Sequence, residues 1–386
     1  MAGQAKKRWF LIILAVFIAV TMTACGAGKK ETTLKIEPPD PYTGAGMQLL
    51  QQGRYEEAAR EFAWSLERNP KNTRALVGMG LAKIYGGDAE AAFEFLEKGC
   101  RYAKNDQEKL FCEVGRIRLD TLAKRDRNWF AESRNAFAEA VRIDPRSSDA
   151  HYYMGLAYRD SLNFDEASKM FREVIDINDS HVREAERELD QIREVQRAMA
   201  TTKTGRKIAL SNHVSRGDCA ALIIEEMKLG KRLNRQAAPD GRQAGGVAKP
   251  GKQAAVHTAK DIADHPFRVH IEDVLRLGVK GLEKYPDGTF RPEEYLNRET
   301  YAVIMEDLME KLGGDMELKK SFEGTESPFG DIKSDSPGYL AVMVVTSRGI
   351  MEPKNKDAME FVPLGPVSGA EALSGMRKLK EELKLY

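Results

Sequence analysis

A repeated pattern with a period of about 34 residues runs from residue 46 to about residue 179. Within each unit, apolar residues recur at spacings of three and four, which is the periodicity of an amphipathic helix. One helical pair cannot bury its own apolar face, so neighbouring pairs have to stack. The repeat therefore restricts this part of the chain to a helical solenoid. A glycine occupies the equivalent position of each unit: Gly46, Gly80, Gly115 and Gly155.

The repeat is clearest in GRYEEAAREFAWSLERNP (53–70) and AHYYMGLAYRDSLNFDEASKMFREVI (150–175). These stretches resemble the tetratricopeptide repeat, a helix-turn-helix unit. The resemblance implies four repeats whose concave face receives a peptide or a helix of a partner protein; a purely structural spacer is the alternative. A charged helix with a narrow apolar seam is expected over residues 182–199. It suits a cap on the last repeat, with a free coiled coil as the alternative.

Residues 261–309 and 329–376 are two copies of another motif. In both, a helical segment ends at a glycine, and a turn with a Phe-x-Pro sequence follows. In 261–309 an Asp-Gly pair supplies a tight turn with a positive φ, and the proline stiffens the exit of the turn. The phenylalanine is expected to plug the core beneath the loop. The structural positions are therefore Asp287, Gly288, Phe290 and Pro292 in one copy, and Phe361 and Pro363 in the other.

The stretch LGVKGLEKYPDGTFRPEEYLNRETYAVIM (277–305) closely resembles a surface-layer homology motif, and HVSRGDCAALIIEEM (213–227) resembles half of a further copy. The resemblance implies a mostly helical, three-pronged domain over 201–386, with motifs at about 201–229, 261–309 and 329–376. It further implies that grooves between the prongs bind cell-wall polysaccharide or peptidoglycan. An arginine at the start of the second helix would contact an anionic group, since its planar fork pairs with carboxylate or phosphate. The binding residues carried over are Arg216, Asp218, Arg298 and Glu299.

We call the motifs at 201–229, 261–309 and 329–376 copies one, two and three. Copy three departs from the family pattern because Gly369 stands where the arginine is expected. For Arg216 and Arg298 the alternative role is hydrogen bonding to neighbouring carbonyl groups at the helix starts. The first helix of copy one has no separate segment of its own. We hypothesise that the 182–199 helix fills this place as well, which would join the two domains into one rigid body.

The N-terminal segment has the order of a secretory signal: a basic start at residues 6–8, an apolar run over 9–20 and small residues before Cys25. Met22-Thr23-Ala24-Cys25 resembles a bacterial lipobox. The resemblance implies cleavage of residues 1–24 and covalent diacylglycerol and acyl lipid on Cys25, and no cofactor is expected. From Gly26 it also implies the periplasmic face of an outer membrane. The alternatives are an ordinary signal peptide and an uncleaved anchor, although a run of about 12 apolar residues falls short of the roughly 20 that span a bilayer.

The rest of the chain excludes several classes of function. The net charge of +1 and the lack of a basic patch with interleaved aromatic residues argue against nucleic acid. No nucleotide-binding or hydrolase motif is present, so no catalytic residue is expected and an enzyme is not predicted. Histidines and aspartates between 257 and 270 match no metal signature, so no metal is expected. Cys100 and Cys112 fall on consecutive helices; we expect two buried thiols, with a disulfide as the alternative.

We therefore predict an all-α chain: a signal peptide (1–24), lipidated Cys25 with a stalk (25–45), a tetratricopeptide solenoid with its cap (46–200) and the three-pronged domain (201–386). A basic insert over about 230–256 is expected to be disordered. The expected function is a non-enzymatic envelope tether that joins a membrane, a protein partner and a wall polymer. The alternative is an assembly accessory for outer-membrane proteins or pili whose second domain is a spacer that binds nothing.

Overall fold

The computed structural model describes residues 40–229, 258–313 and 317–385. Across these ranges the chain is helical, with three isolated β-bridges and no strand. None of the helices in these ranges combines the length and the apolar character that crossing a membrane requires. The predicted signal peptide, the lipidation site Cys25 and the basic insert lie outside the described residues.

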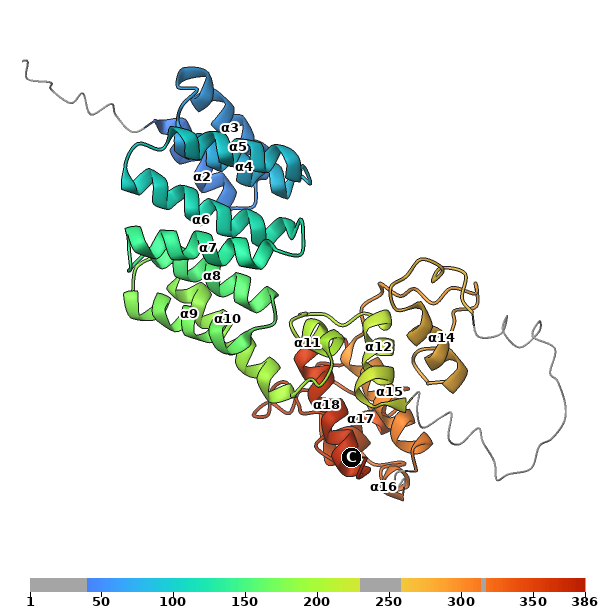
Figure 1. The fold of residues 1–386 in the computed structure, drawn as a ribbon. Helices are drawn as coiled ribbons and strands as arrows, with labels where there is room; N and C mark the ends of the chain where they lie inside the picture. Colours follow the sequence, from blue (N-terminus) through green and yellow to red (C-terminus); the bar gives the residue numbers. More distant parts are fainter. Residues whose placement is uncertain (1–39, 230–257, 314–316, 386) are drawn as a thin grey trace, which may run out of the picture.

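Four helical pairs stack in chain order to form the first domain (Figure 1). The first helix of each pair is capped at its start by a polar side chain, which accepts a hydrogen bond from a backbone N–H group that has no partner within the helix. The capping residues are Asp40, Asn72, Asn105 and Ser147. The pairs are α2 (Pro41–Gln51) with α3 (Tyr55–Arg68), α4 (Thr73–Tyr85) with α5 (Ala89–Tyr102), α6 (Asp106–Ala123) with α7 (Trp129–Ile143), and α8 (Ser148–Asp160) with α9 (Phe164–Ile177).

The first pair begins at Pro41, earlier than the predicted start at residue 46. Asp40 caps this helix by accepting bonds from the N–H groups of Tyr42 and Thr43, and Pro41 is the first helical residue, where its missing N–H costs nothing. The stalk predicted to reach residue 45 is therefore shorter than expected at its C-terminal end.

Small residues let the paired helices approach closely, as the spacing of the repeat predicts. A Cβ atom on Gly46 would lie 2.5 Å from the ring of Phe62, and one on Gly155 would lie 2.6 Å from the ring of Phe171. Both rings are fully buried. Gly46 and Gly155 thus each form one packing unit with the aromatic residue of the following helix.

Cys100 and Cys112 are free thiols on neighbouring helices α5 and α6. Cys112 is buried and Cys100 is partly exposed. The Cys112 thiol hydrogen-bonds to Cys100, which lowers the pKa of Cys100 and raises that of Cys112.

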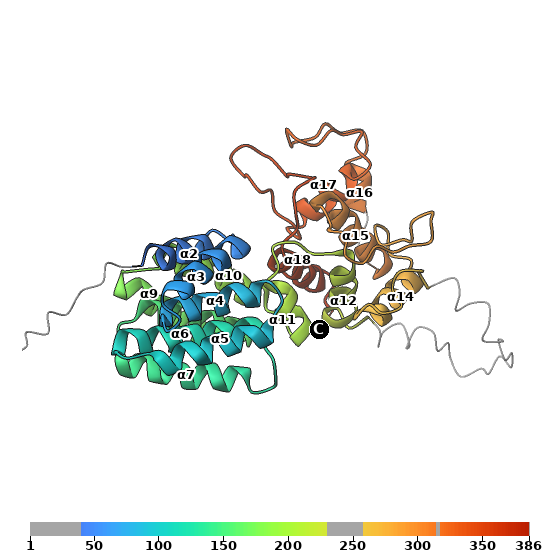
Figure 2. The same ribbon diagram turned by 90° about the horizontal axis from the view of Figure 1, so that it is seen from above.

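Helix α10 (Val182–Ala198) contributes side chains to two cores. Its first part, including Leu189 and Ile192, packs with α9 in the last core of the array, whereas Val195 and Ala198 belong to the core of the second domain. Accordingly α10 contacts both α9 and α18, and α18 lies beside the end of the array in both views (Figures 1 and 2). The helix caps the array, as predicted, and joins it to the second domain.

The second domain is built around one continuous apolar core. The helices that carry the second half of each motif, α12, α15 and α18, pack together through this core. Its helices are α11 (Lys203–Ala209), α12 (Arg216–Glu226), α14 (Arg268–Leu277), α15 (Arg298–Lys311), α16 (Glu317–Ser321), α17 (Tyr339–Ser347) and α18 (Gly369–Glu382).

Candidate functional site

The starts of α12, α15 and α18 meet at the centre of the second domain. The N–H of Val214 donates to Val367 O, and the N–H of Leu296 donates to Val214 O, both at 2.9 Å. Each start is capped by a polar side chain, from Ser215, Asn297 or Ser368. Three segments distant in sequence are therefore held as one junction, in which each helix start faces a segment of another motif.

Arg216, at the start of α12, reaches into the turn of copy two. Its guanidinium donates to three backbone carbonyl groups: Phe290 O at 2.8 Å, Gly281 O at 2.9 Å and Glu283 O at 2.7 Å. The group also lies over the aromatic rings of Tyr285 and Phe290. The side chain thus holds copy one to copy two.

Arg298, at the start of α15, makes the corresponding contact with copy three. It donates to Phe361 O at 2.7 Å and to Glu352 O at 2.6 Å, and it pairs with the carboxylate of Glu371. The residue is fully buried, and this burial lowers the pKa of Arg298 to about 10, so the guanidinium remains charged at neutral pH.

Gly369, at the start of α18, makes the third contact between motifs, which joins copy three to copy one. Its N–H donates to Ser211 O at 2.8 Å, and a Cβ atom at this position would lie 1.7 Å from Ile208 O. Copy one lacks the Asp-Gly turn, and its backbone lies where an arginine side chain of copy three would have to pass. The missing arginine and the missing turn are therefore two halves of one altered contact.

The turn of copy two has the geometry expected from its sequence. Gly288 has a φ of +82°, and the pKa of Asp287 is lowered to about 2 by hydrogen bonds from Thr289 and Arg291. Phe290 is fully buried, and the carboxylate of Asp261 accepts the N–H groups of Phe290 and Arg291.

Copy three repeats this arrangement without the Asp-Gly pair. Phe361 is fully buried, and Asp331 accepts the N–H groups of Phe361 and Val362. Pro363 presents its carbonyl to the N–H of Glu299, as Pro292 does to the N–H of Gly217 in copy two.

All four residues predicted to bind polymer make contacts within the chain. Besides the two arginines, Asp218 forms a capping box with Ser215, and Glu299 accepts the N–H of Gly338 at 3.1 Å. Arg216 is 6% exposed and Arg298 is not exposed at all. The geometry favours the alternative role for the arginines, hydrogen bonding to carbonyl groups, and a contact between these four residues and a polymer stays a prediction.

A surface hollow of about 450 Å³ lies where copy two meets the start of α12. His265, which lines it, pairs with Glu293 at 3.1 Å and fills the space beside Gly217. Acidic groups outnumber basic ones in the lining. Of the residues that the structure describes, none form a group of three or more His, Cys, Asp or Glu side chains that could hold a metal ion. The lining consists of Lys260, Asp261, Ala263, Asp264, His265, Pro266, Pro292 and Glu293.

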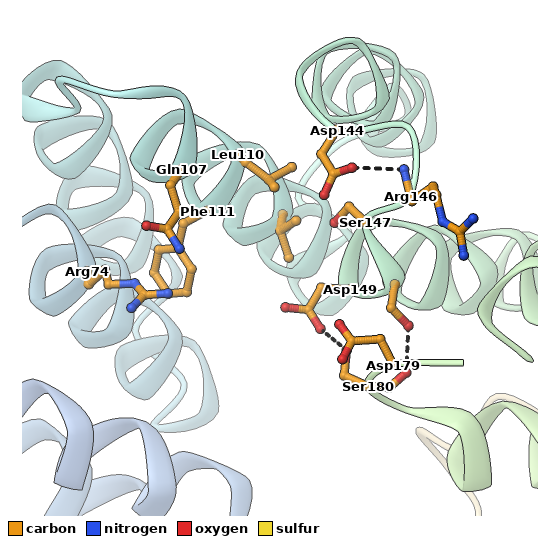
Figure 3. A pocket seen from close by; sticks show the side chains of 12 residues that line it. Arg74, Gln107, Leu110, Phe111, Asp144, Arg146, Ser147, Asp149, Asp179 and Ser180 are labelled. Atoms are coloured by element: carbon orange, nitrogen blue, oxygen red, sulfur yellow. Dashed lines mark hydrogen bonds between the residues drawn. The ribbon is translucent and has the colours of Figure 1, made fainter. Parts of the chain in front are cut away.

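A second hollow, of about 260 Å³, lies along the first helices of repeats two to four (Figure 3). Arg74, Gln107 and Phe111 face Asp149 and Ser180 across it. The carboxylate of Asp149 accepts a bond from Ser180 at 2.8 Å and pairs with His181 at 3.1 Å. The bond from His181 lowers the pKa of Asp149. Basic, aromatic and acidic groups together give a surface suited to a peptide.

Family models match two parts of the chain. The tetratricopeptide repeat matches residues 43–106 and 122–182, and the S-layer homology domain matches residues 328–373. The chain contains tetratricopeptide repeats followed by an S-layer homology domain. Both parts of the predicted identity and the predicted helical fold are thereby confirmed, and lipidation stays a prediction. No curated protein matches the sequence.

Solved structures of repeat proteins resemble the array. One is a thermophilic tetratricopeptide protein of Thermus thermophilus, with 19% identity, coverage of 51% of this chain and 96% of that chain, and a TM-score of 0.35. Another is MamA of Desulfovibrio magneticus, with 16% identity, coverage of 42% and 96%, and a TM-score of 0.27.

Proposed function

We propose that this chain is a non-enzymatic tether of the cell envelope. Tetratricopeptide repeats indicate a scaffold for protein interaction, and an S-layer homology domain indicates anchoring to the cell wall. In the proposed arrangement lipid on Cys25 holds the chain to the outer membrane on its periplasmic side. The repeat groove binds a protein partner, and the S-layer homology domain binds peptidoglycan or wall polysaccharide.

The observation that carries the proposal is the shared helix α10. A tether has to transmit force between its two attachment points, and α10 enters both cores without an intervening linker. Hydrogen bonds reinforce the connection on both sides, from Gln196 to Asp165 in α9 and from Gln191 to Leu210 O after α11. In addition α2, where the described chain begins, lies at the end of the array opposite α10 (Figure 1).

The hollow beside copy two is the surface that we propose for the wall polymer. The two arginines are occupied by carbonyl groups, whereas Asp264, His265 and Glu293 line an open surface. Its excess of acidic groups disfavours a strongly anionic polymer and favours one that presents hydroxyl or amino groups. Peptidoglycan, which carries both, fits this lining better than an anionic polysaccharide.

A second candidate is the assembly accessory with an S-layer homology domain that binds nothing. One observation favours it: each of the four residues carried over from the family as polymer ligands is used inside the chain. On this account the S-layer homology domain only completes the core around α10.

Sedimentation with purified peptidoglycan sacculi separates the two candidates. The full chain in detergent should sediment with sacculi, and the double variant Asp264→Ala, Glu293→Ala should remain in the supernatant. Glu56→Ala with Glu90→Ala, two exposed acids of the array, is the matched control and should sediment like the unchanged chain. If the unchanged chain stays in the supernatant, wall anchoring is wrong and the accessory role is favoured.

A further inference from the structure

A third hollow, of about 420 Å³, lies between helices α5, α6 and α7 of the array. Asp120, on α6, contributes to its lining and is only 3% exposed. Its Oδ2 atom is buried and has no hydrogen-bond partner anywhere in the described ranges of the chain. A buried carboxylate oxygen without a partner is costly, so a native chain that keeps one calls for an explanation.

The equivalent residue of the next repeat shows how the chain otherwise handles such an acid. Asp120 follows Gly115 at the same spacing as Asp160 follows Gly155. The carboxylate of Asp160 is paired with Lys124 at 2.9 Å and with Arg159 at 3.0 Å. In the hollow, Leu119 stands where Arg159 precedes Asp160, and among the residues that the structure describes no cation pairs with Asp120.

The lining carries an excess of negative charge. Two arginines are present, but Arg116 pairs with Glu113 at 3.9 Å, and the guanidinium of Arg125 lies 4.4 Å from the ring centre of Phe93. Burial and the nearby charge of Glu132 raise the pKa of Asp120 to about 7, against the opposing effect of the two arginines. The acids of the lining are Glu97, Glu113, Asp120, Glu132 and Glu139.

We propose that this hollow binds a lysine side chain of a partner protein, with its ammonium group on Asp120. One buried oxygen matches the compact charge of an ammonium group better than the planar fork of a guanidinium. Phe93 and Ala136 supply apolar wall for the methylene stem of a lysine. The surrounding acids attract the cation, and the new bond satisfies the buried oxygen.

This surface is separate from the groove in Figure 3. That groove is formed along α4, α6 and α8, whereas the lysine hollow lies between α5 and α7 with α6 beneath them. The two sites share no lining residue. The array would therefore offer a partner two contacts, and the lysine site does not depend on the proposed wall anchoring.

Saturation-transfer NMR on the full chain in detergent tests the lysine site. The probe is the peptide acetyl-Ala-Lys-Ala-amide, and its control is acetyl-Ala-norleucine-Ala-amide, which keeps the stem and lacks the charge. The methylene groups of the lysine side chain should show saturation transfer from the protein, and those of the norleucine side chain should show none. Asp120→Asn should weaken binding of the lysine peptide by about tenfold or more, since it removes the negative charge that strengthens the hydrogen bond from the ammonium group.

The matched control variant is Asp160→Asn, which removes the equivalent acid of the next repeat and should bind the lysine peptide like the unchanged chain. Asp120→Asn keeps the shape of the side chain, and circular dichroism establishes that both variants are folded. Equal transfer to the two peptides, or unchanged binding in Asp120→Asn, would overturn the proposal.

Discussion

At the scale of single residues, the second domain depends on which groups its helix starts present to the neighbouring motif. Arg216 and Arg298 each satisfy carbonyl groups of the next turn, whereas Gly369 leaves room for the backbone at Ile208. These residues act through close contact inside the domain. Replacing them should therefore change stability directly.

Gly369→Ala should lower the free energy of unfolding by about 2–4 kcal/mol, because its Cβ atom would overlap a backbone carbonyl that cannot move aside. Urea unfolding followed by circular dichroism measures the change. Gly330→Ala is the control, since no atom lies within 4 Å of a Cβ atom there, and it should cost less than about 0.5 kcal/mol. Equal effects of the two substitutions would refute the close approach at Gly369.

Asp120 should make stability depend on pH. Its pKa of about 7 in the folded chain exceeds the ordinary value near 3.8, so the folded state holds the proton to higher pH than the unfolded state does. The free energy of unfolding should therefore fall as the pH rises from about 4 to about 7. Asp120→Asn removes this pH-dependent loss. Above pH 7 the free energy of unfolding of the variant should exceed that of the unchanged chain by about 2–4 kcal/mol. Urea unfolding at a series of pH values measures the difference, and a gain that does not vary with pH would contradict it.

At the scale of elements, α10 and the pair α5–α6 connect parts that the sequence presents as separate. Helix α10 completes the last repeat and the core of the second domain, and α5 and α6 bring two thiols together. The shared helix predicts that the two domains unfold together, and the neighbouring thiols predict that the two cysteines react with each other.

Val195→Ala, a substitution on the S-layer side of α10, should destabilise the array as well. The described tryptophans, Trp64 and Trp129, both lie in the array, so their fluorescence reports its unfolding. The free energy of unfolding should fall by about 1–3 kcal/mol, and by the same amount whether it is measured by tryptophan fluorescence or by circular dichroism. Val269→Ala, at a residue that is 65% exposed, should leave both unchanged. If the tryptophan transition keeps its original midpoint in Val195→Ala, the two parts unfold independently.

Mild oxidation should join Cys100 to Cys112. The Cys112 thiol lowers the pKa of Cys100, which increases its share of the thiolate that attacks an oxidant, and Cys112 supplies the second sulfur. Closing so short a loop should raise the free energy of unfolding by about 2–3 kcal/mol. Thiol alkylation followed by mass spectrometry detects the bond, with Cys112→Ser as the variant that cannot form it. Two thiols that stay open to alkylation after treatment with oxidised glutathione would show that the geometry forbids the bond.

Sequence periodicity predicted the elements better than it predicted the contacts between motifs. The spacing of apolar residues and the glycine-aromatic pairs are local, so the repeats, the capping helix and the turn at Asp287 could be recognised directly. The closure of copy three onto copy one joins Gly369 to residues 208–211, and no local pattern marks such a contact. The unpaired state of Asp120 was likewise hidden, because Asp160 occupies the same position and is paired.

At the scale of the whole molecule, the array and the second domain form a continuous body through α10, with α2 at the opposite end of the array (Figure 1). A lipid at Cys25 would attach to the chain on the N-terminal side of α2, and a wall polymer would attach on the C-terminal side of α10. This separation suits a chain that connects two surfaces and leaves the sides of the array free for protein partners.

The most direct test of tethering reconstitutes the lipidated full chain in fluorescent lipid vesicles and mixes them with purified sacculi. We expect the sacculi to sediment the vesicles, and Asp264→Ala with Glu293→Ala to leave the vesicles in the supernatant. Cys25→Ala, which removes the lipid site, should let the chain sediment without vesicles. If vesicles that carry the unchanged chain stay in the supernatant, the chain does not connect a membrane to the wall.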